Sequence, residues 1–168
     1  MFLQTLIQAL SEVPPWLATI IMAMLPVAEL RGALPVAITV YKLPLFEAIL
    51  LSILGNMLPV YFLLVFFERV STHLSQRSDF AKRFFDNIFE RTRLKLEANV
   101  EKYGPWALAL FVSVPLPVTG AWTGALAAFV FGLPKKKAFL AILVGVCVAS
   151  AVVTILTLGA TSTIRLLF

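Results

Sequence analysis

A carboxylate and a guanidinium stand two residues apart near the N-terminus, at Glu29 and Arg31, in a stretch that is otherwise apolar. Pro26 and Pro35 flank the pair, and Gly32 follows it directly. Charged side chains inside a membrane are costly and therefore mark functional sites. Positions i and i+2 do not face each other on a regular helix, so pairing these two side chains requires non-helical backbone, which glycine and proline permit. We predict a substrate-binding site here, in which Glu29 can also exchange a proton; the alternative is an external loop with two solvated charges.

A second stretch, later in the sequence, is polar without being charged. Its hydroxyl groups, its indole and the backbone groups freed by proline could form the other half of one cavity. The predicted substrate-binding residues of this stretch are Pro115, Pro117, Thr119, Gly120, Trp122 and Thr123. The alternative for either threonine is a hydroxyl bonded to a nearby backbone carbonyl. Asn56, in the middle of a long apolar run, either faces the same site or ties helices together.

Soluble-type enzyme chemistry has no support in the sequence. The chain has one cysteine, Cys147, and one histidine, His73, so an internal disulfide, a thiolate zinc cluster and a multi-histidine metal site are excluded. Phosphate-binding loops, nucleophile elbows and paired catalytic carboxylates are missing from the sequence as well. We therefore expect no cofactor, no metal ion and no catalysis.

The composition indicates a membrane protein. Hydrophobic residues make up 60% of the chain and charged residues 14%, whereas soluble domains carry about 25% charged residues. Lipid is therefore the expected solvent for most of the chain. In such a protein the net charge of +5 reports membrane orientation and contact with anionic lipid headgroups rather than nucleic-acid binding.

The apolar runs fall into two classes by length. A helix needs about 20 apolar residues to cross the bilayer, and only residues 43–67 and 138–163 meet that requirement. The shorter runs come in pairs, and each pair is expected to form a re-entrant hairpin that enters the membrane and returns. These shorter runs are residues 13–28, 32–41, 103–118 and 121–133.

Residues 68–102 have a different character, because they hold most of the charged residues of the chain. Phe80, Phe84, Ile88 and Leu96 recur on one helical face, opposite a charged face. The pattern predicts an amphipathic helix at the membrane surface, in contact with anionic lipid headgroups. A solvated helical linker is the alternative.

The two halves of the sequence match at a constant offset. Pro105-Trp106 follows Pro15-Trp16 by 90 positions, and Leu133-Pro134 follows Leu43-Pro44 by the same number. Gly145 corresponds to Gly55 in the same register, so the matches fall on residues that start, stop or bend helices. We predict a single all-α membrane domain over residues 1–168, with repeat one at 13–67, an amphipathic connector at 68–102 and repeat two at 103–163.

The order of elements predicts the topology. A hairpin returns to the side it entered and a span changes side, so repeat two must be inverted relative to repeat one, as in many secondary transporters. The connector and the three lysines Lys135, Lys136 and Lys137 carry most of the positive charge, which places them in the cytoplasm and both termini outside. We expect a multi-pass protein of the cytoplasmic (inner) membrane. Gly145 and Ala149 offer a small-residue face for a homodimer.

The motifs at residues 29–35 and 120–126 resemble the bacterial and archaeal family of small multidrug export proteins, and the resemblance covers nearly the whole chain. That family in turn looks like a compact relative of the DedA/VTT membrane proteins. These have two re-entrant hairpins in inverted repeats and are implicated in moving lipids, including undecaprenyl phosphate. The resemblance implies that Glu29 matches acidic residues of their first hairpin. Their second hairpin carries arginines, and this sequence has none between Lys102 and Lys135, so Arg31 would supply the cation alone.

Three functions follow as hypotheses. The first is a transporter or flippase for an amphiphile, with a lipid-linked anion such as a polyprenyl phosphate bound at Arg31 and a proton exchanged at Glu29. The second is proton-coupled export of lipophilic cations, in which Glu29 binds substrate and proton in turn. The third is a non-transporting membrane adaptor, in which the motifs at the hairpin tips are packing devices. The expected partners are a membrane lipid or an amphiphilic small molecule, and no nucleic acid.

Overall fold

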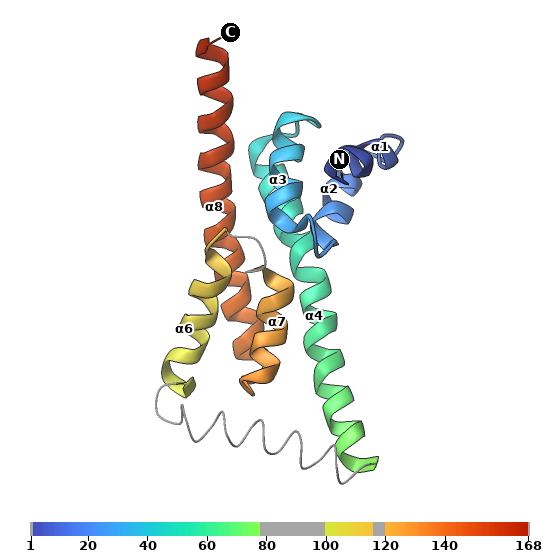
Figure 1. Cartoon of the computed structure of the whole chain (residues 1–168), viewed down its shortest axis with the longest axis vertical. Helices are drawn as coiled ribbons and strands as arrows, with labels where there is room; N and C mark the ends of the chain where they lie inside the picture. The colour runs from blue at the N-terminus through green and yellow to red at the C-terminus, as the bar shows by residue number, and fades with distance from the viewer. Residues whose placement is uncertain (1, 78–99, 116–119, 168) are drawn as a thin grey trace.

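The computed structural model describes residues 2–77, 100–115 and 120–167, and all the regular structure in these residues is helical (Figure 1). The predicted all-α class is therefore confirmed for this part of the chain. Residues 78–99, which hold most of the predicted amphipathic connector, lie outside it, as do Pro117 and Thr119. The helices are α1 (Phe2–Ala9), α2 (Pro15–Met24), α3 (Glu29–Thr39), α4 (Leu45–Arg77), α6 (Val100–Ser113), α7 (Ala121–Val130) and α8 (Lys135–Leu167).

The two long helices correspond to the two predicted spans. Apolar stretches of 26 residues in α4 and 29 residues in α8 are long enough to cross a membrane, because about 20 residues suffice. Both helices extend beyond the predicted limits. Residues 68–77, assigned to the connector, continue α4. The three lysines form the first turn of α8 rather than an interruption before it.

Both long helices start in the same way. Each is preceded by a Leu-Pro pair, and the proline carbonyl accepts the first helical hydrogen bond, from Ala48 to Pro44 and from Ala138 to Pro134, at 2.9 Å in both cases. The turn before each pair also matches, because Lys42 has φ 52° and Gly132 has φ 63°. These two residues are 90 positions apart, and their left-handed backbone ends α3 and α7. The sequence repeat is therefore reflected in local structure.

A glycine brings each long helix against the first arm of its own hairpin. A Cβ on Gly55 of α4 would lie 2.6 Å from the carbonyl oxygen of Ile20 in α2. A Cβ on Gly145 of α8 would lie 2.6 Å from the carbonyl oxygen of Ala109 in α6. Any larger residue would push the backbones apart, so these two glycines fix equivalent helix pairs. Gly145 thus packs inside the chain; its predicted role in a homodimer face stays a prediction.

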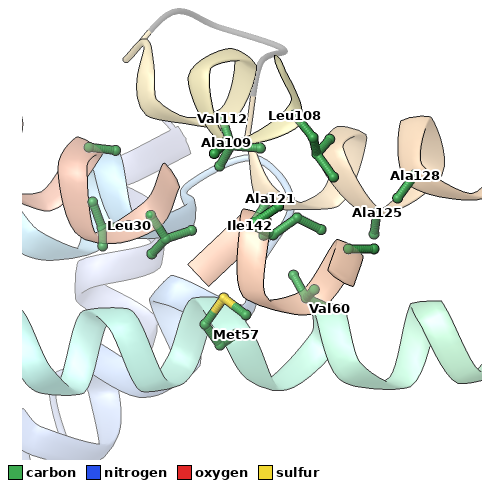
Figure 2. Packing of buried hydrophobic residues seen from close by; sticks show 14 of the residues in the cluster. Leu30, Met57, Val60, Leu108, Ala109, Val112, Ala121, Ala125, Ala128 and Ile142 are labelled. Atoms are coloured by element: carbon green, nitrogen blue, oxygen red, sulfur yellow. The ribbon is translucent and has the colours of Figure 1, made fainter. Parts of the chain in front are cut away.

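Figure 1 shows α2 and α3 as an antiparallel pair, with α6 and α7 forming a second pair that points toward the first. Side chains from five helices meet where the pairs approach each other. Leu30 of α3, Met57 and Val60 of α4, Val112 of α6, Ala121 of α7 and Ile142 of α8 lie close together there (Figure 2). Small residues on α7 allow this close approach. That the pairs are re-entrant hairpins in inverted repeats stays a prediction.

Candidate functional site

The tips of the two helix pairs contact each other, and the contacts involve residues singled out in the sequence. We call the turn between α2 and α3, residues 25–28, the first tip. The second tip comprises the described residues on either side of the gap between α6 and α7, namely Val114, Pro115 and Gly120. Three side chains next to the tips, Glu29, Arg31 and Trp122, contact helix ends of the opposite pair: two in the second pair and one in the first.

Glu29 supplies the negative charge at the start of α7. Its Oε1 accepts a hydrogen bond from the backbone N–H of Trp122 at 3.4 Å, and the N–H of Ala121 also donates to the carboxylate. The N-cap residue Gly120 provides no side-chain cap. The first N–H groups of a helix have no partner within the helix and carry partial positive charge, so a carboxylate there is stabilising.

The position of this carboxylate depends on two unusual backbone features. Glu29 has φ 47°, in the left-handed region that costs a residue with a Cβ about 1–2 kcal/mol. Its side chain is only 8% exposed and lies directly against Gly120, where a Cβ would collide with the carboxylate. Strained backbone of this kind is frequent at functional sites. Gly120 is therefore required because it leaves room for the carboxylate of Glu29.

Arg31 contacts the other helix of the second pair, at the same tip. Its guanidinium donates to the carbonyl oxygen of Val114 at 3.0 Å and to that of Val112 at 3.5 Å. These carbonyls lie at the end of α6, which finishes at Ser113. The last carbonyls of a helix lack partners and carry partial negative charge, which a cation stabilises. Arg31 is also close enough to Glu29 for Coulombic attraction between the two side chains.

Trp122 makes the return contact from the second pair to the first. Its indole N–H donates to the carbonyl oxygen of Met24 at 3.2 Å. Met24 is the last residue of α2, so this carbonyl is again one of those left without a partner inside the helix. Each helix pair therefore caps helix ends of the other.

The structure brings Glu29 and Arg31 to the place where the two pairs meet, but only one of the residues expected to permit non-helical backbone, Gly32, Pro26 and Pro35, lies in irregular backbone. Gly32 lies inside α3, and its N–H bonds to the carbonyl of Ala28 at 2.7 Å. Pro35 is also inside α3. The irregular backbone is the turn that contains Pro26, together with Glu29 itself, because these residues end α2 and start α3.

The remaining predicted residues are placed differently. Thr123 follows the alternative interpretation, since its hydroxyl donates to the carbonyl of Gly120 at 2.9 Å. Pro115 is half-buried at the second tip. Asn56 is 3% exposed in α4, and its Oδ1 has no hydrogen-bond partner among the described residues. A buried amide oxygen without a partner is costly, so Asn56 is a position where a bound ligand could contribute.

Two further buried hydroxyls also lack a hydrogen-bond partner among the described residues, and they were not singled out from the sequence. Ser52 lies one helical turn before Asn56, and Thr154 lies in α8; neither Oγ atom has a partner within the described part of the chain. The spacing of Ser52 and Asn56, four residues apart in an apolar run, was the available signal. Nothing in a single sequence indicated the carbonyls of Met24, Val112 and Val114. Among residues 2–77, 100–115 and 120–167, no three His, Cys, Asp or Glu side chains are grouped so as to hold a metal ion.

Comparison with known protein families gives one match. Residues 29–152 match the profile of the small multi-drug export proteins. The chain belongs to this family. The match begins at Glu29, directly after the first tip, and includes the second tip. No curated protein and no solved structure matches the chain.

Membership in this family, together with two helices able to cross a bilayer, indicates a membrane protein that acts as a transporter rather than an enzyme. The relationship to the DedA/VTT proteins stays a prediction. So do the inner-membrane location, the cytoplasmic connector and the external termini.

Proposed function

We propose that the protein exports an amphiphile with an anionic head group, and that the head passes the contact between the two tips. The observation that carries this proposal is the placement of one cation and one carboxylate at that contact. The carboxylate of Glu29 is buried against α7, whereas Arg31 is only half-buried. Of the two charges, the cation is therefore the more available to a substrate.

The contacts of Arg31 support a role in binding an anion. Its partners in the second pair are neutral carbonyl oxygens, at 3.0 Å and 3.5 Å. Hydrogen bonds from arginine to a phosphate or carboxylate are stronger than hydrogen bonds to a neutral acceptor. The planar guanidinium can also donate two parallel hydrogen bonds to either group. An anionic head could thus replace the carbonyls of Val112 and Val114 and separate Arg31 from the end of α6.

Glu29 is proposed as the proton-exchanging group. Its negative charge is attracted to the N-terminus of α7, and a protonated carboxyl would lose that attraction. Protonation would therefore weaken one of the contacts between the tips. Proton uptake would favour separation of the tips, and proton release would favour their contact, which couples the position of the tips to a proton gradient.

The lengths of the short helices support a re-entrant arrangement. Helices α2 and α7 have 10 residues, α3 has 11 and α6 has 14, so they are roughly 15–21 Å long at 1.5 Å per residue. That is about half to two-thirds of the hydrocarbon thickness. Two such pairs, entering from opposite sides and meeting at their tips, would place Glu29 and Arg31 near mid-membrane. Transporters with inverted repeats bind substrate at that depth.

The family description favours a second candidate, the export of drug-like lipophilic cations. In this case Glu29 would bind the cation in exchange for a proton. A cation must then replace the N–H donors of Trp122 and Ala121 at the carboxylate, and it must also tolerate the positive charge of Arg31 nearby. The geometry thus favours the anion, and the two candidates differ in what Arg31 contributes.

Transport into or across liposomes tests the proposal. The purified protein is reconstituted and the transbilayer movement of a polyprenyl phosphate is compared with the uptake of a lipophilic cation dye, with and without a pH gradient. We expect movement of the anion that is lost in Arg31→Ala and retained in Arg69→Ala, which removes an exposed arginine of α4. Cation uptake that survives Arg31→Ala and is lost in Glu29→Gln would establish the second candidate. If neither substrate moves in folded protein, both transport candidates fail, and recovery of a stoichiometric partner would then establish the adaptor.

A further inference from the structure

A cavity lies between α6 and α7, on the half of this helix pair that is away from the tips. Its volume is about 460 Å³ and every residue lining it is apolar. Phe111 and Phe131 contribute half-exposed rings, and Ala107 and Ala127 leave space between the helices. The volume is within the range of small-molecule sites, about 300–1,000 Å³. It lacks the polar groups that would orient a polar ligand.

A second, smaller cavity adjoins the first, because Leu133 lines both. It measures about 200 Å³ and is polar at one end, where Glu68 and Lys135 line it. The Lys135 ammonium donates to Glu68 Oε2 at 2.6 Å. Lys136 and Lys137 follow in the first turn of α8, and both are exposed. Leu133 therefore separates an apolar cavity from a smaller one that Lys135 lines, and two further exposed lysines follow Lys135 in the sequence.

In the first repeat, an apolar segment packs on the corresponding part of the α2–α3 pair. Leu6, Ile7 and Leu10, from α1 and the turn after it, pack against the apolar cluster of α2 and α3, and Tyr41 packs there too. Tyr41 corresponds to Phe131 at the offset of 90 positions. The residues 90 positions after α1, 92–99, lie outside the described part of the chain.

We propose that this composite site binds a single anionic membrane lipid. An acyl chain fills the cavity between α6 and α7, and the phosphate of the head group lies at Lys135, Lys136 and Lys137. The occupant follows from the chemistry, since an apolar cavity beside a cationic cluster matches the two ends of a phospholipid. Basic clusters at the ends of membrane helices attract anionic head groups. This lipid is bound rather than transported, and the site does not include Glu29 or Arg31.

Native mass spectrometry of the delipidated protein in detergent tests the site. Phosphatidylglycerol and phosphatidylcholine with the same acyl chains are titrated separately. We expect one phosphatidylglycerol to be retained at concentrations where phosphatidylcholine is not. Replacing two lysines together, Lys136→Gln and Lys137→Gln, should reduce this preference by about tenfold or more. Equal retention of the two lipids by the unmodified protein would overturn the proposal.

Filling the cavity tests where the acyl chain of the lipid lies. Ala127→Trp occupies the cavity, whereas Leu126→Trp places the same ring at the neighbouring position, where the native side chain is 48% exposed and does not line the cavity. We expect only Ala127→Trp to abolish retention of the lipid. Retention in both variants places the lipid elsewhere and contradicts the assignment.

A milder variant covers the case in which Ala127→Trp fails to fold. Phe131→Trp, made in a chain that also carries Trp16→Phe, Trp106→Phe and Trp122→Phe, keeps an aromatic ring at the cavity and is the single tryptophan. Phosphatidylglycerol brominated on its acyl chain should quench the fluorescence of this tryptophan. Unbrominated phosphatidylglycerol should restore the signal at lower concentrations than phosphatidylcholine. Equal restoration by both lipids would show that Phe131 contacts bulk lipid only.

Discussion

Replacing the carboxylate of Glu29 with an amide should weaken the contact between the two tips. Glu29→Gln preserves the size and one acceptor oxygen but removes a charge that is 8% exposed at the start of α7. A carboxylate at a helix N-terminus stabilises by about 0.3–1 kcal/mol at a surface and up to about 2 kcal/mol when partly buried. Arg31 also loses its Coulombic partner, which adds to the cost. We expect the free energy of unfolding to fall by about 1–2 kcal/mol.

Trp122 offers a direct readout of this contact. The chain has three tryptophans, and Trp16 and Trp106 are 52% and 69% exposed, so Trp16→Phe with Trp106→Phe leaves one reporter at the tip. Its emission is followed through a denaturant titration in mild detergent, with and without Glu29→Gln. The expected change corresponds to a factor of about 5–30 in the ratio of folded to unfolded protein.

Glu47→Gln is the matched control, because Glu47 is an exposed acid in the first turn of α4. Its effect should stay within about 0.5 kcal/mol. The opposing effect at Glu29 is desolvation, since a neutral amide is easier to bury than a carboxylate. An unfolding free energy that is unchanged or higher in Glu29→Gln would show that desolvation outweighs capping, and the explanation of the tip contact would be refuted.

Three further variants, one of them with a matched control, test other parts of the structure. Gly145→Ala brings a Cβ to 2.6 Å from the carbonyl of Ala109 and should cost about 1–3 kcal/mol in an unfolding titration. Gly159→Ala is the control on the same helix, because a Cβ there would have no neighbouring atom within 4 Å. It should be neutral or stabilise the protein by up to about 1 kcal/mol. Equal changes in unfolding free energy for the two variants would contradict the close packing at Gly145. Trp122→Phe removes the indole N–H and should cost about 0.6–1.7 kcal/mol and speed hydrogen exchange around the first tip, where unchanged exchange would argue against the contact. Asn56→Ala should change stability by less than about 1 kcal/mol while reducing transport, and full transport would remove Asn56 from the substrate path.

The sequence identified which residues matter at the tips more successfully than it predicted what they do. Glu29 and Arg31 stood out because charges are rare in a chain this apolar. Their expected partner was each other, and the non-helical backbone was assigned to Gly32 and to the flanking prolines Pro26 and Pro35. The structure keeps Gly32 helical and places the left-handed backbone at Glu29 itself. Propensity rules could not predict this, because they disfavour φ > 0 for glutamate, and only the surrounding packing holds it there.

The sequence by itself determined the class of protein, the two spans and the residues that start, stop or bend the helices of the repeats. Apolar length, Leu-Pro pairs and glycines act within a few residues, so a local pattern is enough to reveal them. Only the tertiary structure decided the partners of Glu29, Arg31 and Trp122. Arg31 and Val114 are 83 positions apart, and Glu29 and Trp122 are 93 positions apart. The partners are backbone carbonyls and N–H groups at helix ends, which every sequence contains and which become specific only when folding brings one helix end against a particular side chain.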